Sequence, residues 1–177
     1  MIIVVVSLAR AGKDTFADYL VKNYNYKKIN TSDILVKSLI DMGKEPTKIN
    51  QSWLGDVWRK ESGRMDIVTL RAIENIQGNN IVITGIRSQE EVDLVKQKFP
   101  DMITISIVAD KLIRYSRRTK SDAQKLEDFL ARDTRDIENK GLAKVLCKSD
   151  YFLCNNSSLE GFYSDIDRLL RRLENEV

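Results

Sequence analysis

The chain has 177 residues, of which 42% are hydrophobic and 31% charged, so its length and composition suit a single domain, residues 1–177, with a sizeable core. Its 29 basic and 26 acidic residues leave a net charge of only +3, which argues against a protein that coats nucleic acid, and the lack of histidine excludes imidazole bases and His-ligated metals. Two cysteines without metal-ligand spacing, and the absence of a stretch of roughly 20 apolar residues, indicate a cytoplasmic protein that binds neither nucleic acid nor a membrane.

A strand and a helix enclose a variant phosphate-binding loop at the start of the chain. The unbroken β-branched run Ile2–Val6 is typical of a buried parallel strand, and apolar residues at helical spacing begin at Phe16. Between them the motif G-x-x-x-x-G-K-[ST] is met in part, since Gly12 and Lys13 keep the turn and the cation while Ser7 replaces the first glycine. We predict that this loop binds the phosphates of ATP through Ala9, Arg10, Ala11, Gly12, Lys13, Asp14 and Thr15.

Two helical segments follow the second strand, Tyr26–Asn30. The first begins at Ser32 and Asp33, and the second, up to Gly63, is expected to bury one face that carries Ile49, Trp53, Leu54 and Val57. A helix N-cap accounts for Ser32 and Asp33. The alternative is that Asp33 faces the transferred phosphate, where it holds a metal-bound water or accepts the proton of an acceptor hydroxyl.

A third strand, Ile81–Thr84, comes after a helix predicted over Met65–Gln77 and before a capping box at Ser88–Glu91. Arg87 lies between that strand and that helix, where a cation is unfavourable to the helix dipole. We therefore expect Arg87 to hold a phosphate with its guanidinium, the alternative being a solvated side chain.

A basic segment follows the fourth strand, Met102–Val108. Arg114, Arg117 and Arg118 share one face of a helix predicted over residues 111–118, and three like charges repel unless an anion lies between them. This pattern predicts a lid over residues 111–122 that closes on the triphosphate, and a solvated basic face is the alternative. A further helix is expected to start at Ser121–Gln124 and to carry Arg132, Asp133, Arg135 and Asp136 as a salt-bridged surface.

The chain ends with a fifth strand, Tyr151–Cys154, and an amphipathic helix from Leu159. Cys154 is expected in the core, and Asn155, directly after the strand, is a candidate contact for a purine ring. Strands that alternate with helices predict an α/β fold with a five-stranded parallel sheet covered on both faces, whose ligands bind at the carboxyl ends of the strands.

With these residues assembled, nearly the whole chain resembles the P-loop nucleotide kinases, in particular the adenylate-kinase-related and dephospho-coenzyme-A-kinase-like proteins of archaea. The marks of the resemblance are Gly12–Thr15, Ser32–Asp33, Thr84–Ser88, Arg114–Asp122, Phe129–Asp133 and Ser149–Tyr151 followed by Asn155. The resemblance implies a P-loop kinase fold with a short helical lid, ATP with Mg²⁺ as donor, and a small phosphorylated acceptor. Thr84 stands where the family usually has Asp, so Asp14 is expected to bind the metal.

The chemistry left to Lys, Arg, Asp and a bound metal is that of phosphoryl transfer. We expect an ATP-dependent phosphotransferase, acting as a monomer or homodimer on a nucleoside monophosphate, in which Lys13, Asp33, Arg114 and Arg118 are catalytic and Arg114 and Asn155 also contact the nucleotide. The acceptor should lie along the helices of residues 32–64, on Ser32, Asp33, Arg59, Arg64 and Arg87. The alternatives are a dephospho-coenzyme A kinase and a nucleotide-binding switch with little transferase activity.

Overall fold

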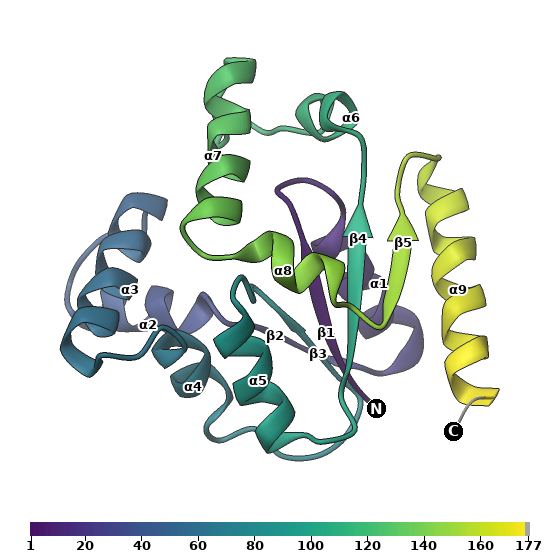
Figure 1. Cartoon of the computed structure of the whole chain (residues 1–177), viewed down its shortest axis with the longest axis horizontal. Helices are drawn as coiled ribbons and strands as arrows, with labels where there is room; N and C mark the ends of the chain where they lie inside the picture. The colour runs from purple at the N-terminus through teal and green to yellow at the C-terminus, as the bar shows by residue number, and fades with distance from the viewer. Residues whose placement is uncertain (176–177) are drawn as a thin grey trace.

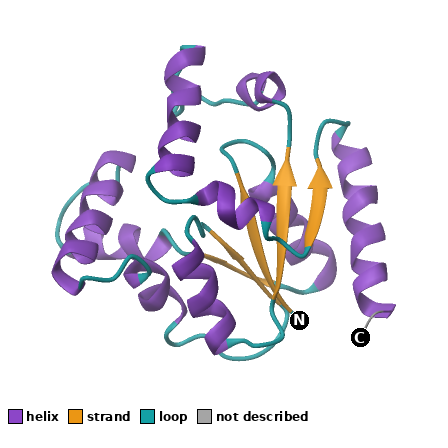
Figure 2. Ribbon diagram, viewed as in Figure 1, coloured by secondary structure: helices purple, strands orange, loops and turns teal. Residues whose placement is uncertain are grey.

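The computed structural model describes residues 1–175 and confirms an all-parallel sheet of five strands flanked by helices (Figure 1). The strands lie in the order β2-β3-β1-β4-β5, so the first strand of the chain is the central one. Their carboxyl ends all point to one edge of the sheet, where the loops gather (Figure 2). The strands are β1 (Ile2–Ser7), β2 (Lys27–Asn30), β3 (Ile81–Thr84), β4 (Ile103–Val108) and β5 (Tyr151–Cys154).

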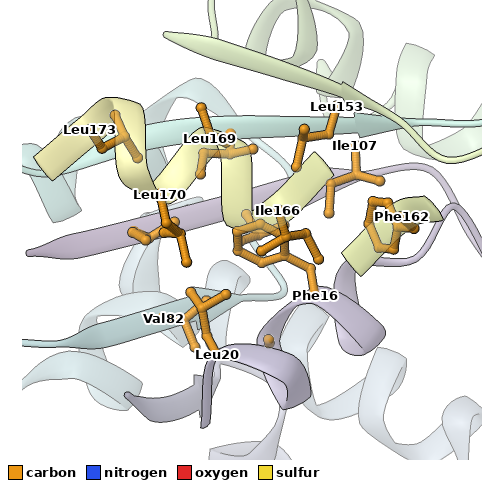
Figure 3. Packing of buried hydrophobic residues seen from close by; sticks show 14 of the residues in the cluster. Phe16, Leu20, Val82, Ile107, Leu153, Phe162, Ile166, Leu169, Leu170 and Leu173 are labelled. Carbon is orange, nitrogen blue, oxygen red and sulfur yellow. The ribbon is translucent and has the colours of Figure 1, made fainter. Parts of the chain in front are cut away.

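Helices α1 (Lys13–Tyr24) and α9 (Leu159–Asn175) cover one face of the sheet. Alternate side chains of a strand point to opposite faces, so Ile3 and Val5 of β1 pack on this side. Figure 3 shows Phe16 of α1 and Ile166 of α9 among the fully buried side chains between the two helices and the strands. This apolar layer fixes the start of α1, and therefore the loop before it.

The opposite face of the sheet is covered by three helices. Val4 and Val6 of β1 contact this layer, because they alternate with Ile3 and Val5. The helices are α4 (Ile67–Ile73), α5 (Gln89–Lys98) and α8 (Leu142–Cys147). Helix α4 is shorter than the predicted Met65–Gln77, and α8 was not predicted at all; its six residues are too few for periodicity to reveal.

Helices α2 (Asp33–Asp41) and α3 (Lys48–Ser62) pack with α4 into an apolar cluster of their own, beside the sheet. The predicted buried face of α3 is wrong in part, because Ile49 is 81% and Trp53 44% exposed, whereas Leu54 and Trp58 are buried. The buried face of α3 also includes Gln51 and Gly55. A polar and a small residue hid that face from the hydrophobic pattern.

Helices α6 (Lys111–Ser116) and α7 (Leu126–Glu138) lie beyond the carboxyl ends of the strands (Figure 1). Helix α7 begins five residues after Ser121, so the expectation that Ser121–Gln124 start it is wrong. Cys154 is exposed on the edge strand β5, which corrects its expected place in the core. Within residues 1–175 there is no helix both long and apolar enough to cross a membrane.

Candidate functional site

The loop between β1 and α1 turns through a glycine that no other residue replaces without strain. Gly12 has φ +116°, and a Cβ on it would lie 2.2 Å from the side-chain nitrogen of Asn155. Arg10 also has a positive φ, +61°, and Ala11 between them is buried. The loop is therefore a tight turn, and its backbone is fixed because Ala11 packs into the hydrophobic core.

Asn155, directly after β5, links this loop to the end of β4. Its side-chain nitrogen donates to the carbonyl of Ala11 at 2.8 Å, and its side-chain oxygen accepts from Arg117 at 3.3 Å. Its backbone N–H donates to Val108 at the end of β4. The structure brings Asn155 to the loop, as expected, and the purine contact remains a prediction for which both ends of the amide are already engaged.

The carboxylate of Asp14, at the start of α1, lies between two lysines. Lys13 donates to the carboxylate of Asp14, and Lys28 of β2 lies 3.4 Å from the same carboxylate. Loss of hydration raises the pKa of Asp14, but attraction to Lys13 and Lys28 outweighs it, so the pKa lies below its ordinary value. Asp14 is thus a charged, exposed carboxylate next to the loop.

Arg114 is buried, 4% exposed, and its charge is compensated from within the protein. It donates to Asp133 of α7 at 2.7 Å and to the carbonyl of Ala9 in the loop at 3.1 Å. Arg117 points to Asn155, and Arg118 lies over the ring of Tyr115 at 4.0 Å. The expectation of an external anion is therefore wrong for Arg114, whose charge Asp133 neutralises, and it stays a prediction for Arg117 and Arg118.

The segment before α7 is joined to the loop by ion pairs. Arg10 lies 2.5 Å from Asp122 and donates to Thr119 at 2.7 Å, while Arg132 of α7 approaches the same Asp122 at 3.7 Å. Asp122 therefore does not cap a helix. It links the loop to α7.

The ends of β2 and β3 meet closely at Gly85. This residue has φ +96°, and a Cβ on it would lie 2.4 Å from the hydroxyl of Thr31. The backbone N–H of Thr31 also donates to the carbonyl of Thr84 at 3.0 Å, so the two strand ends are bonded to each other. The hydroxyl of Thr84 is buried and has no hydrogen-bond partner among the described residues.

Asp33 is exposed at the first residue of α2 and accepts from Asn30 at 2.9 Å. The cap residue, Ser32, makes no side-chain capping bond. The N-cap therefore does not explain this pair of residues, and the carboxylate of Asp33 stands open at the carboxyl edge of the sheet.

Arg87 is paired with α7, the helix that was expected to be a salt-bridged surface. Its guanidinium lies 3.2 Å from Asp136, which also accepts from Lys140 at 2.9 Å. Asp133 and Asp136 are both buried, at 7% exposed each, so the surface interpretation is wrong for the acids of this helix. The signal that could have found them is their spacing from buried Phe129, which places all three on the inward face.

The charge of Arg87 acts on three other basic side chains, and we call the four together the cation cluster: Lys48, Arg87, Arg132 and Lys140. Burial and repulsion from Arg87 hold the pKa of Arg132 and of Lys140 below their ordinary values. Loss of hydration, followed by repulsion from Arg132, Arg87 and Lys13, also lowers the pKa of Lys48. Only Arg87 of this cluster was predicted as a binding residue.

The other two arginines expected to bind the acceptor are held by carboxylates of their own segment. Arg59 lies 3.1 Å from Asp56, and Arg64 forms a bidentate pair with the carboxylate of Asp66, at 2.7 and 2.8 Å. The charge of Arg59 still reaches Lys140, whose pKa it lowers. The structure therefore brings Arg59 toward the cation cluster and leaves Arg64 exposed.

A divalent cation would find few protein ligands at this edge. No three Asp, Glu or Cys side chains gather into a metal site within residues 1–175. Mg²⁺ is usually held by one or two carboxylates together with phosphate oxygens and water, and Asp14 and the partnerless hydroxyl of Thr84 suit that sparse mode of binding.

The sequence matches the model of a family described as AAA domain over residues 3–138. A UPF0200 protein of Thermococcus kodakarensis is 26% identical over 96% of this chain and 96% of its own length. Another, from Pyrobaculum aerophilum, is 28% identical over 97% of this chain and 98% of its own.

Solved structures with the same fold include shikimate kinases. The enzyme from Bacteroides thetaiotaomicron has a TM-score of 0.62 at 12% identity and covers 97% of this chain and 98% of its own. The enzyme from Acinetobacter baumannii, solved in complex with shikimate, has a TM-score of 0.63 at 15% identity, with 99% and 93% covered. The fold is therefore that of a P-loop kinase.

Proposed function

This chain belongs to the AAA domain family, and from that premise we propose that it is an ATP-dependent phosphotransferase whose acceptor is a small phosphorylated molecule, with nucleoside monophosphates as the favoured class. One observation carries the proposal. The carboxyl edge of the sheet holds two sets of cations, the loop with Lys13 and the cation cluster, and a kinase needs two anion sites, one for donor and one for acceptor.

The chain's own residues supply the positioning and the charge that phosphoryl transfer requires. The backbone of Ala9–Gly12 and the start of α1 hold the donor phosphates, and Lys13 neutralises charge on the transferred group. Arg114 braces the carbonyl of Ala9. Arg118, two residues beyond the end of α6, is the cation that we expect to neutralise charge on the triphosphate. Bound Mg²⁺ would supply further neutralisation, with Asp14 as its protein ligand.

A specific observation favours a second candidate, a dephospho-coenzyme A kinase. That reaction transfers phosphate to a ribose hydroxyl, which needs a base, and the open carboxylate of Asp33 could accept the proton. In the transfer to a nucleoside monophosphate, by contrast, the nucleophile is a phosphate oxygen, which needs no base. The third candidate, a nucleotide-binding switch, is supported by Thr84 at the position where kinases carry an Asp.

The proposal is tested by incubating the protein with ATP, Mg²⁺ and a panel of acceptors, and counting nucleotide products. The panel holds nucleoside monophosphates, dephospho-coenzyme A, other phosphorylated metabolites and shikimate. Product from one class identifies the enzyme, and ATP binding without product from any acceptor favours the switch.

Lys13→Ala provides the matched test of the loop, because its side chain serves the anion site and not the core. Its rate of transfer should fall by about 10² to 10³, the usual effect of removing a group aimed at transferred charge. Lys22→Ala, at an exposed position near the end of α1, is the control and should keep full activity. Near-normal turnover of Lys13→Ala would sink the assignment of the loop.

A further inference from the structure

The cation cluster has more positive charge than its neighbours compensate. Asp136 is shared by Arg87 and Lys140, and Asp122 is shared by Arg132 and Arg10. Lys48 forms no ion pair among residues 1–175, and its ammonium donates only to Gln51 at 3.3 Å. Like charges brought together in a protein repel, so such a cluster is unfavourable without an anion.

The position of Lys48 on its helix makes the cluster still less favourable without an anion. It is the first residue of α3, next to the N-cap Thr47, where the helix dipole is positive and a cation is disfavoured. Asp14 is the carboxylate that attracts Lys48, and Lys13 and Lys28 already contact it. Both the helix and the neighbours of Lys48 therefore favour an anion at this point.

Two helices bring the cluster together from distant parts of the sequence. On α3, Lys48, Gly55 and Arg59 follow one another at helical spacing along one face. On α7, Arg132 and Asp136 are one turn apart, and Lys140 follows just beyond the helix. Repulsion from Arg132 lowers the pKa of Lys48, and repulsion from Arg59 lowers the pKa of Lys140, so α3 and the end of α7 lie near enough for their charges to interact.

We propose that Lys48, Arg87, Arg132 and Lys140 form a binding site for a phosphate monoester dianion of the acceptor, with Asp136 as the residue that positions Arg87 and Lys140. This inference rests on the proposed function and names residues that select its substrate. A phosphate monoester carries about two negative charges at neutral pH and offers three acceptor oxygens, whereas a carboxylate carries one charge. The site therefore selects phosphorylated acceptors over carboxylate acceptors of similar size.

The test measures anion binding without turnover, by isothermal titration of inorganic phosphate and of acetate into the full chain. The loop is first saturated with a non-hydrolysable ATP analogue and Mg²⁺, so that phosphate cannot bind there. Lys48→Gln and Arg132→Gln are compared with Lys60→Gln and Arg135→Gln, exposed cations on the same two helices. Thermal unfolding establishes that each variant is folded.

We expect phosphate to bind the wild type more tightly than acetate, and its affinity to fall about tenfold or more in Lys48→Gln and in Arg132→Gln, the effect of losing one charge-assisted hydrogen bond. The two control variants should bind phosphate as the wild type does. Equal phosphate affinity in Lys48→Gln and Lys60→Gln, or equal affinity of the wild type for phosphate and acetate, overturns the site.

The acceptor panel separates this inference from the function on which it rests. If no acceptor is phosphorylated while phosphate binding follows the expected pattern, the transferase fails and the anion site stands. If an acceptor is phosphorylated while Lys48→Gln leaves phosphate affinity unchanged, the transferase stands and the site is refuted.

Discussion

The two halves of the carboxyl edge handle positive charge in opposite ways. On the loop side three cations have a carboxylate within ion-pair distance: Arg10 has Asp122, Lys13 has Asp14 and Arg114 has Asp133. In the cation cluster, Lys48 has no ion pair with any residue that the structure describes, and Asp136 is divided between Arg87 and Lys140.

This difference teaches which half is held in shape by the protein itself. The loop side is bonded and packed before any ligand enters, so it is preorganised for the triphosphate that we propose as its ligand. The cation cluster keeps its charges unbalanced, so the anion that we propose as its ligand would contribute the missing negative charge. Removing a charge should therefore reduce stability on the loop side and increase it in the cluster, while binding falls on both.

The largest effect is expected for Asp133→Asn, which leaves the buried guanidinium of Arg114 without its anion. Breaking a buried ion pair by removing one partner typically lowers the free energy of unfolding by about 3 to 5 kcal/mol. Urea denaturation should show this loss, with Glu138→Gln at an exposed position of α7 as the control. A variant as stable as this control would mean that Arg114 does not depend on Asp133.

A smaller loss is expected for Gly12→Ala. The methyl group meets the amide of Asn155 in a backbone conformation that side chains rarely adopt, and together these effects should lower stability by about 2 to 4 kcal/mol. Gly43→Ala has a positive φ as well but open space around it, and it should lose less.

The double variant Gly12→Ala/Asn155→Ala separates the clash from the backbone strain. If the clash matters, the double variant loses less free energy of unfolding than the two single variants lose in sum, because the amide that obstructs the methyl group is gone. Strict additivity in denaturation experiments would assign the whole effect of Gly12→Ala to strain.

The smallest effect has the opposite sign. Lys48→Gln should raise the free energy of unfolding at pH 7, within the roughly 0.5 kcal/mol usual for surface substitutions, because it removes a charge that the fold disfavours. The pKa of Lys48 is lowered in the folded state, so the unfavourable charge is fully present below that pKa and gone above the unfolded value of about 10.4. The gain should therefore be seen in urea denaturation at pH 7 and vanish as the pH rises toward that value.

The loop side could be predicted from the sequence to a larger extent than the cation cluster. The strands, the loop with Gly12 and Lys13, and the place of Arg87 at a strand end follow from local patterns of apolar residues, glycine and caps, and the structure has them where predicted. The partners of Arg114 and Arg87 lie 19 and 49 residues away on α7, and no local pattern encodes such pairings. Lys48 escaped prediction for the same reason, since its importance depends on cations such as Arg87 and Arg132 that lie far from it in the sequence.

The place of β1 in the sheet sets an order in which the site is completed during synthesis. Ile3 pairs with Val82 on one side and with Ile103 on the other, so the strand that carries the loop is made first and waits for partners about 80 and 100 residues later. The carbonyl of Ala11 waits longer still, for Asn155. In contrast, α2 to α4 share an apolar cluster drawn from residues 34–70, whose local contacts form early. A chain emerging from the ribosome is therefore expected to pack the helices beside the proposed acceptor site well before it closes the loop that we propose binds the donor.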